Sequence, residues 1–424
     1  MDVLDELRWR GLLGQSTDEG ALRSALAQPL TFYVGFDPTA PSLHIGSLVQ
    51  LLVARRLQRS GHTPLLLVGG ATGLIGDPKP TAERALNDVD VVAGWVERLR
   101  RQVEPYVEVS GPAAASVVNN LDWTAGLSAV ELLRDVGRHF RVGRMLAKEA
   151  VAARMGSDEG ISYAEFSYQV LQGNDFLELH RRHGCSLQFG GSDQWGNITA
   201  GVDLVHRVEQ RSVHAFTVPL VTKADGTKFG KTETGTVWLD PALTSPYAFH
   251  QFWLQVEDAS VGGYLRAFTD RGPEEVDELE RATVERPAAR AAQRALARDV
   301  TGLVHGEEAV DAAEAAAAAL FGRGDVAALD APTLEAALAE LPQVRVGEGA
   351  RTVVELLAAS GLSPSRSAAR RAVADGGAYV NNVAVVDGDA EPGGDRLLHG
   401  RWLLLRRGKR TLAAVDARPG GAAG

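Results

Sequence analysis

The stretch that decides the fold is residues 31–59, TFYVGFDPTAPSLHIGSLVQLLVARRLQR. Its first six residues alternate and are rich in aromatic and β-branched side chains, which predicts a strand that ends at the Asp-Pro pair. From Leu48 onward the apolar residues recur at helical spacing. We therefore expect a strand followed directly by a helix, with HIGS at residues 44–47 on the first helical turn.

The start of this helix is a candidate site for polyphosphate. The first turn of a helix offers unpaired N–H groups and the positive end of the helix dipole. His44 can donate to phosphate oxygens there, and Gly46 lacks a Cβ, so that a flat ring can lie against the backbone. Taken alone, these four residues are better explained by an incidental surface histidine.

A second stretch, VTKADGTKFGKT at residues 221–232, is a glycine-rich cationic loop. Lys228, Lys231 and Thr232 would suit closure over a triphosphate. It is not a P-loop, because Asp225 stands where the pattern G-x-x-x-x-G-K-S/T needs a glycine. A basic surface loop explains any one of these lysines, but the two stretches together favour a triphosphate site.

Length and composition predict a folded protein of two or three domains, with 424 residues of which 45% are hydrophobic. No run of about 18 apolar residues occurs, and the N-terminal residues form an acidic amphipathic pattern instead of a signal peptide. We therefore expect a cytoplasmic protein with no membrane contact. The single cysteine, Cys185, excludes an internal disulfide, and with His180 and His183 it lacks a fourth metal ligand.

Charge is distributed unevenly along the chain. The net charge is −10, which argues against nonspecific nucleic-acid binding by the chain as a whole. Residues 351–424 carry 11 Lys and Arg against 7 Asp and Glu, so this part is +4 and the first 350 residues are −14. The sequence thus predicts a basic module attached to an acidic body.

Two further glycine-rich turns follow short apolar strands. Residues 65–68 lead into GGATGLIGDP, and residues 187–189 lead into GGSDQWGN. Continuous apolar strands separated by helices predict a parallel sheet covered on both faces, and such sheets bind ligands at the carboxyl ends of their strands. On the helix expected between these strands, Tyr168, Gln172 and Asp175 share one face, which favours a polar pocket wall over core.

Several motifs together resemble one enzyme family. HIGS and KFGKT resemble the HIGH and KMSKS signatures of class I aminoacyl-tRNA synthetases. The longer stretches that resemble bacterial tyrosyl-tRNA synthetases, in order and spacing, are YVGFDPTAPSLHIG, VGGATGLIGDP, EFSYQVLQGNDF, QFGGSDQWGNITAG and PLVTKADGTKFGKT. The resemblance spans nearly the whole chain.

The resemblance implies an α/β fold: a Rossmann-like, doubly wound parallel sheet, an α-helical anticodon-binding domain and a small α+β C-terminal RNA-binding domain of the ribosomal-protein-S-four-like type. The domains it implies are 1–220, with a dimer-interface insertion around 82–160, then 221–340 with the KMSKS-type loop and the helical domain, then 350–416, and a disordered tail at 417–424. Composition separately suggests a linker at 341–349.

The reaction that the resemblance implies has two steps. L-tyrosine and ATP form tyrosyl-adenylate and pyrophosphate, and the tyrosyl group then passes to the 3′ end of tRNA(Tyr). ATP would enter as a substrate accompanied by Mg²⁺, with no protein-bound metal or organic cofactor, and the enzyme would be a homodimer. The first step needs alignment and charge stabilisation and no protein nucleophile.

Individual site residues are carried over from the matching motifs. The implied catalytic residues are Thr39, His44, Lys228, Lys231 and Thr232. The implied tyrosine-binding residues are Tyr33 and Asp175 at the phenol, Asp77, Tyr168 and Gln172 at the ammonium group, and Gln194 near the carboxylate. The implied ATP-binding residues are Gly35, Asp37, His44, Gly46, Ser47, Gly191, Asp193 and Lys231. A site that pairs buried groups with a substrate hydroxyl rejects the analogue without it, and tyrosine against phenylalanine is the standard example of this rule.

RNA contacts are expected in two places. In the C-terminal module, the arginines expected to face phosphates from one side of a helix are Arg366, Arg370 and Arg371. In the insertion, the basic residues that form either an acceptor-stem contact or an ordinary solvated face are Arg138, Arg141, Arg144 and Lys148. Two departures from the family pattern stand out: Ser47 replaces the second histidine of HIGH, and Phe229-Gly230 with Thr232 replace three residues of KMSKS.

Three other interpretations remain open. A tryptophanyl-tRNA synthetase shares the fold, but gives no reason for the pair Tyr33 and Asp175. A non-catalytic RNA-binding relative would not need His44, Asp77 or the two lysines. A nucleotidyltransferase acting on a small molecule leaves the helical domain and the basic module without a purpose.

Overall fold

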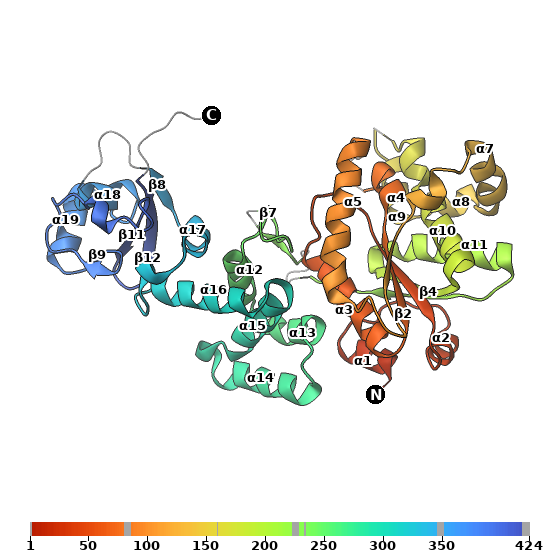
Figure 1. The fold of residues 1–424 in the computed structure, drawn as a ribbon, viewed down its shortest axis with the longest axis horizontal. Coiled ribbons are helices and arrows are strands. Elements are labelled where there is room, and N and C mark those ends of the chain that lie inside the picture. The colour runs from red at the N-terminus through yellow and green to blue at the C-terminus, as the bar shows by residue number, and fades with distance from the viewer. Residues whose placement is uncertain are drawn as a thin grey trace. The chain divides into compact units, whose positions relative to one another are not determined.

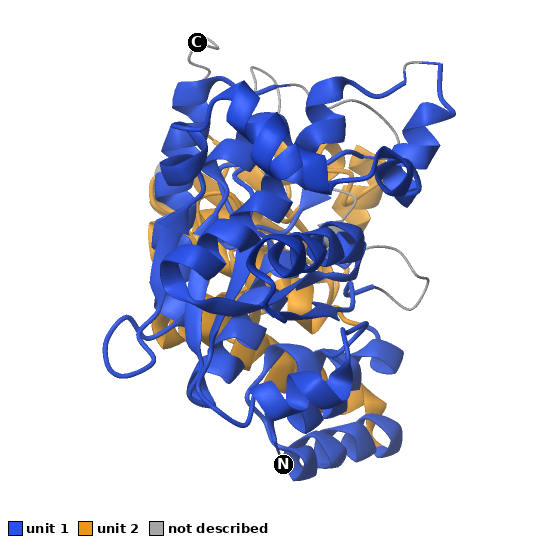
Figure 2. Ribbon diagram, turned by 90° about the vertical axis from the view of Figure 1, so that its right-hand side faces the viewer, with its two compact units in different colours: residues 1–240, 257–285 blue, residues 241–256, 286–424 orange. Residues whose placement is uncertain are grey.

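The computed structural model describes residues 2–79, 86–158, 160–222, 229–232, 235–345 and 352–417 (Figure 1). The chain forms two compact units (Figure 2). The first unit comprises residues 1–240 and 257–285, and the second comprises residues 241–256 and 286–424. These units are defined by how the chain packs. The domain boundaries given above come from the family resemblance, and they stay predictions.

A five-stranded sheet forms the centre of the first unit, in the order β3-β2-β1-β4-β5. Its strands are β1 (Thr31–Phe36), β2 (Thr63–Val68), β3 (Ser116–Asn119), β4 (Cys185–Gly191) and β5 (His214–Val218). Every neighbouring pair is parallel, which confirms the predicted parallel sheet. The strand order reverses between β1 and β4, and open sheets of this kind bind ligands in the crevice beyond that point.

Helices connect and cover these strands. The longer helices of the first unit are α3 (Ile45–Arg59), α5 (Val89–Val103), α10 (Tyr163–His183), α11 (Trp195–Glu209), α13 (Asp258–Phe268) and α14 (Pro273–Glu285). The shorter ones are α1 (Val3–Trp9), α2 (Glu19–Ala25), α4 (Gly70–Ile75), α6 (Leu121–Thr124), α7 (Ala129–Glu131), α8 (Val142–Leu146) and α9 (Glu149–Met155). The predicted succession of a strand at residue 31 and a helix at HIGS is confirmed.

One apolar cluster fixes α10 against the sheet. Phe176 and Leu177 of α10 pack in the same core as Tyr33 of β1 and Leu65 of β2. All four side chains are almost completely buried. Asp175, the residue before Phe176, is itself 1% exposed, so its carboxylate also lies in the interior.

The second unit combines helices with a mixed sheet. Its helices are α12 (Pro246–Leu254), α15 (Ala291–His305), α16 (Glu307–Leu320), α17 (Ala331–Ala339), α18 (Val353–Ala359) and α19 (Arg366–Ala374). Its sheet has the order β10-β9-β11-β12-β8. The strands are β8 (Gln343–Arg345), β9 (Ala378–Val380), β10 (Val383–Ala384), β11 (Trp402–Arg407) and β12 (Thr411–Asp416).

The suggested linker at 341–349 is wrong for residues 343–345, since these form β8. Val344 of this strand pairs in parallel with Val415 of β12. Three residues are too few to show an alternating pattern, so only the distant partner strand identifies them as β-structure. In the predicted tail, the Ala417 amide donates to the Arg401 carbonyl at 2.9 Å, and residues 418–424 lie outside the described residues.

A buried histidine at the entry to β2 predicts acid sensitivity. His62 is 1% exposed, and neither of its ring nitrogens has a hydrogen-bond partner among the described residues. Burial lowers the pKa of His62 below its ordinary value. The folded state therefore binds the proton more weakly than the unfolded state does, so this contribution to stability is complete above about pH 6.5 and is lost as the pH falls.

We expect His62→Leu to flatten the acid side of the stability profile. The free energy of unfolding of the wild type should fall more steeply between pH 7 and pH 5 than that of the variant, by at most about 1.4 kcal/mol per pH unit. Urea unfolding at several pH values measures the two slopes. Equal slopes would show that His62 does not titrate on unfolding.

Candidate active site

The side chain of His44 shapes the first turn of α3. His44 is the N-cap residue, and its Nδ1 accepts a hydrogen bond from the Gly46 amide at 3.0 Å. A Cβ on Gly46 would lie 2.8 Å from Cε1 of the imidazole. A larger residue at position 46 would therefore displace the imidazole from this position.

The end of the cationic loop lies against this helix start. The Val237 amide donates to the Gly230 carbonyl at 2.9 Å, and the Ile45 amide donates to the Val237 carbonyl at 3.3 Å. The Trp238 ring lies 6.3 Å from the imidazole of His44. Two stretches that are far apart in the sequence are thereby joined through the backbone.

The loop itself ends in a small hairpin. Strand β6 (Lys231–Thr232) pairs with β7 (Gly235–Thr236) in an antiparallel ladder. Lys231 therefore follows Gly230, whose carbonyl accepts from Val237, the residue that binds the Ile45 amide. Lys228 lies outside the described residues, and only the backbone of Lys231 and Thr232 is described.

Asp37, at the carboxyl end of β1, is held by two hydroxyl groups. Its Oδ2 accepts a hydrogen bond from Tyr168 at 2.6 Å, and its Oδ1 accepts one from Thr72 at 2.6 Å. A Cβ on Gly69 would lie 2.2 Å from both Asp37 Oδ1 and Thr72 Oγ1. The glycine-rich turn after β2 thus leaves room for a polar cluster at the sheet edge.

Asp175 is a buried carboxylate with two neutral donors. Nδ2 of Asn120 donates to its Oδ2 at 2.9 Å, and Nε1 of Trp123 donates to its Oδ1 at 2.8 Å. Asn120 also donates to Thr72 at 3.0 Å, which connects this group to the cluster around Asp37. Burial raises the pKa of Asp175 to about 7, although both donors act to lower it.

Three buried oxygen atoms close to this edge have no hydrogen-bond partner among the described residues. They are the hydroxyl of Tyr33 and the side-chain carbonyls of Gln172 and Gln188. Tyr33 and Gln188 are register partners on β1 and β4, and burial, followed by the charge of Asp175, raises the pKa of Tyr33. Buried polar groups are costly when unpaired, so this edge favours a polar ligand.

Asp77, after α4, is surrounded by donors. Its Oδ1 accepts from Nζ of Lys148 at 2.9 Å and from Nδ2 of Asn197 at 3.2 Å. Its Oδ2 accepts from Nε2 of Gln194 at 2.9 Å. Asp77 and Gln194, both expected at the tyrosine, are thus in direct contact.

The remaining predicted nucleotide-binding positions lie at the ends of β1 and β4. Gly35 and Thr39 are exposed, Ser47 is half-buried on the first turn of α3, and Asp193 is exposed directly after β4. A Cβ on Gly191 would lie 2.5 Å from Oδ1 of Asp193. All these positions are therefore on the edge where the sheet order reverses.

The predicted RNA-binding arginines are on the surface of α19. Arg366 lies 3.3 Å from Glu355, and Arg370 lies 3.0 Å from Asp389. Arg371 is also exposed. Exposed ion pairs of this kind are weak, so a phosphate could replace the carboxylates as a partner.

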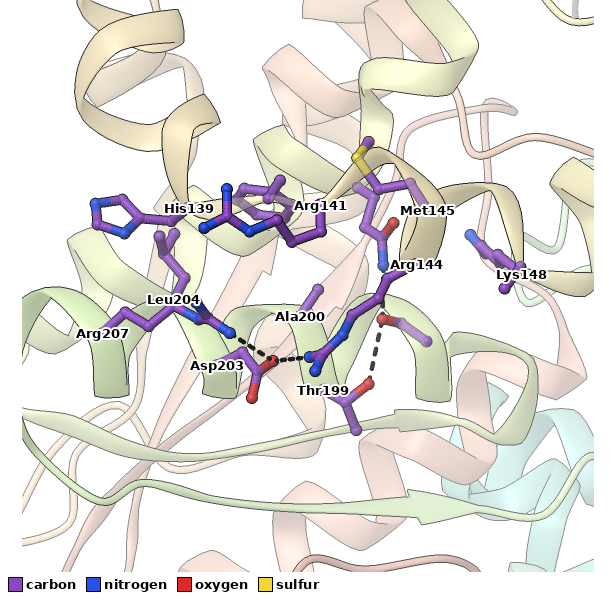
Figure 3. Close-up of a pocket in the computed structure, with 14 residues that line it drawn as sticks. His139, Arg141, Arg144, Met145, Lys148, Thr199, Ala200, Asp203, Leu204 and Arg207 are labelled. Atoms are coloured by element: carbon purple, nitrogen blue, oxygen red, sulfur yellow. Dashed lines mark hydrogen bonds and ion pairs between the residues drawn. The ribbon is translucent and has the colours of Figure 1, made fainter.

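A separate pocket of about 450 Å³ lies between the insertion and helices α10 and α11 (Figure 3). The basic residues that line it are His139, Arg141, Arg144, Lys148 and Arg207. Arg144 forms an ion pair with Asp203 at 2.9 Å. Residues expected to bind tyrosine or ATP do not line this pocket, but Lys148 reaches from its wall to Asp77.

Sequence reasoning missed several residues at the sheet edge. They are Thr72, Asn120, Trp123, Gln188, Asn197 and, as the partner of Asp77, Lys148. One signal was available for Asn120, since it follows β3 at the carboxyl end of a parallel strand. Gln188 lies on β4 beside β1, but the pairing register that shows this is absent from the sequence.

The described part of the chain has neither a metal-ligand cluster nor a membrane-spanning helix. No group of three or more His, Cys, Asp or Glu side chains there could hold a metal ion. No helix there is long and apolar enough to cross a membrane.

Known families and proteins match nearly the whole of this chain. The family model described as tRNA synthetases class I (W and Y) matches residues 25–322. A second, described as Tyrosine--tRNA ligase SYY-like C-terminal domain, matches residues 333–415. The Tyrosine--tRNA ligase of Streptomyces griseus is 64% identical over 99% of this chain and 100% of its own length. That of Kineococcus radiotolerans is 63% identical over 98% of both chains.

Solved structures show the same fold. A C-terminally truncated mitochondrial tyrosyl-tRNA synthetase of Aspergillus nidulans matches 73% of this chain and 92% of its own, with a TM-score of 0.66 and 29% identity. A tryptophanyl-tRNA synthetase from Encephalitozoon cuniculi matches 78% of this chain and 89% of its own, with a TM-score of 0.55. At 11% identity the second match speaks for the fold alone.

Proposed function

Because the chain belongs to the tyrosine–tRNA ligases of class I, we propose that the sheet edge beyond β1 and β4 is where it activates L-tyrosine with ATP for transfer to the 3′ end of tRNA(Tyr). One observation carries this placement. The Ile45 amide donates to the Val237 carbonyl, and the Leu239 amide donates to the Leu43 carbonyl. Because Val237 also binds Gly230, the end of the cationic loop lies at the start of α3.

The substrate phenol is held by Tyr33 and Asp175. The support is chemical: Tyr33 is a buried hydroxyl without a partner among the described residues, and Asp175 is a buried carboxylate fixed by Asn120 and Trp123. Such a site loses hydrogen bonds when phenylalanine or tryptophan enters, because neither carries the phenol hydroxyl.

The other end of the substrate is bound by polar side chains from three elements. Asp77, Tyr168 and Gln172 hold the ammonium group, and Gln194 lies near the carboxylate. Tyr168 and Gln172 are one helical turn apart on α10, so they present neighbouring side chains. Gln194 is already within hydrogen-bond distance of Asp77, which keeps the two ends of this subsite together.

ATP binds at the start of α3 under the cationic loop. His44, Gly46, Ser47 and Thr39 contact the nucleotide from the helix side, and the loop side contributes Lys228, Lys231 and Thr232. Gly35, Asp37, Gly191 and Asp193 complete the nucleotide contacts. The tyrosine carboxylate attacks the α-phosphorus, pyrophosphate leaves, and the lysines with the helix N-terminus stabilise the charge that develops on it. Mg²⁺ accompanies ATP as part of the substrate.

RNA binding belongs to the later parts of the chain. The helical region within 221–340 binds the anticodon arm, and residues 350–416, carrying Arg366, Arg370 and Arg371, contact phosphates. Exposure of these arginines and the basic composition of the module support this. Residues 1–220 form the catalytic domain, the insertion at 82–160 forms a homodimer interface, and the enzyme works in the cytoplasm.

ATP–pyrophosphate exchange with tyrosine, phenylalanine and tryptophan in parallel tests the placement of specificity. We expect exchange with tyrosine, and Tyr33→Phe should reduce the preference for tyrosine over phenylalanine by about tenfold, the value of one neutral hydrogen bond. Exchange with tryptophan alone would overturn the assignment of the phenol site. A Tyr33→Phe enzyme with unchanged preference would remove Tyr33 from it.

A further inference from the structure

Asp77, to which we assign the substrate ammonium, already has a cation. Nζ of Lys148 lies 2.9 Å from its Oδ1, and the two side chains are only 12% and 17% exposed. The same ammonium donates to Oδ1 of Asn197 at 2.9 Å. Lys148 is therefore bound at the group where the tyrosine ammonium has to bind.

The surroundings of Asp77 make Lys148 the component that can exchange. Gln194 and Asn197 are neutral, and they also bind each other, Nδ2 of Asn197 donating to Oε1 of Gln194 at 3.0 Å. They can keep their contacts when a further cation approaches. Lys148 cannot do so without cost, because two ammonium groups around one half-buried carboxylate repel each other strongly.

The side chain of Lys148 also borders an open pocket that could receive its ammonium group. Lys148 is the N-cap residue of α9, and its side chain lines the pocket that Arg141, Arg144 and Asp203 border (Figure 3). Rotation of its long, flexible stem would carry the ammonium from Asp77 towards that open pocket.

We infer that Lys148 is an exchangeable counter-ion of Asp77, displaced by the ammonium group of the incoming tyrosine, so that Lys148 sets the affinity for the amino acid. This rests on the proposed role of Asp77. Lys148 acts as a positioning residue: it orients the carboxylate before the substrate binds, and it weakens substrate binding by competing for that carboxylate. A purely structural ion pair would predict the opposite, a loss of affinity when Lys148 is removed.

The test compares ligands with and without an ammonium group. Equilibrium dialysis without ATP and tRNA gives Kd for L-tyrosine and for 3-(4-hydroxyphenyl)propionate, which lacks the ammonium. Lys148→Met should bind tyrosine about tenfold more tightly while its affinity for the propionate stays unchanged, since only the first ligand competes with Lys148. Lys148→Arg, which keeps the charge, should stay close to the wild type. Arg100→Met removes a cation from an exposed pair with Glu104 and should change neither Kd.

Each other outcome has a definite meaning. Unchanged or weaker tyrosine binding by Lys148→Met overturns the inference, as does an equal shift for both ligands. If Lys148→Met fails to fold, Lys148→Gln, which keeps a donor but removes the charge, must show the same selective gain. Asp77→Asn tests the role of Asp77 separately from that of Lys148. It should weaken the binding of L-tyrosine more than that of the propionate; if it does not, the proposed role of Asp77 fails, whatever the Lys148 variants show.

Discussion

Replacing Asp175 by Asn is expected to lower kcat/KM for tyrosine in the activation step by about a hundredfold, with little change for phenylalanine. The side chain is 1% exposed and accepts hydrogen bonds from Asn120 and Trp123. An amide supplies one acceptor and one donor, so one of these neighbours would face an N–H group. The phenol would also lose its charged acceptor, whereas phenylalanine has no hydroxyl to lose.

ATP–pyrophosphate exchange with both amino acids measures this loss of discrimination. Asp122→Asn, the same chemical change at an exposed position, is the matched control and should leave both rates unchanged. An equal loss for tyrosine and phenylalanine would contradict the assignment, because it would show that Asp175 only maintains the fold.

Because the pKa of Asp175 is raised, we also expect tyrosine affinity to depend on pH. Burial raises this pKa to about 7, so the carboxyl group is largely protonated at pH 6 and largely ionised at pH 8. Since the ionised form accepts the phenol proton, tyrosine affinity should rise across this range, and it should be flat in Asp175→Asn. The sign for stability is opposite: the folded state holds this proton more tightly, so the contribution of Asp175 to stability falls as the pH rises from about 4 to about 7.

Replacing Glu165 by Gln is expected to destabilise the first unit by about 3–5 kcal/mol. Glu165 accepts from Nη1 of Arg154 at 3.0 Å, and the two side chains are 2% and 1% exposed. Nε of Arg154 also donates to the Gly160 carbonyl at 3.0 Å. The substitution would leave the buried Arg154 guanidinium without its counter-charge. Glu165 itself lies on the first turn of α10, the helix that carries Tyr168 and Asp175.

Midpoints of urea unfolding, compared between variants, measure this effect. The double variant Arg154→Met with Glu165→Leu should recover most of the loss, because it removes both charges and fills the space. Asp203→Asn, which breaks the exposed pair with Arg144, is the control and should cost less than about 1 kcal/mol. A Glu165→Gln midpoint equal to that of the control would show that the buried pair contributes nothing.

The sequence by itself determined the parts of this protein that depend on neighbours in the chain. Alternation in residues 31–36, the proline turn and the helical spacing after Leu48 predicted β1 and α3, since strand and helix periods are local properties. The apolar strands with glycine-rich ends predicted a parallel sheet and its ligand-binding edge. The spacing of Tyr168 and Asp175 on one helix predicted a polar wall.

Only the tertiary structure decided which groups meet across the sheet. The donors to Asp175 come from the segment after β3, Gln188 comes beside Tyr33 through strand register, and Lys148 reaches Asp77 from α9. β8 exists because β12 pairs with it. Such contacts depend on how distant strands and helices pack and on where long side chains then end, and no period in the sequence records either of these.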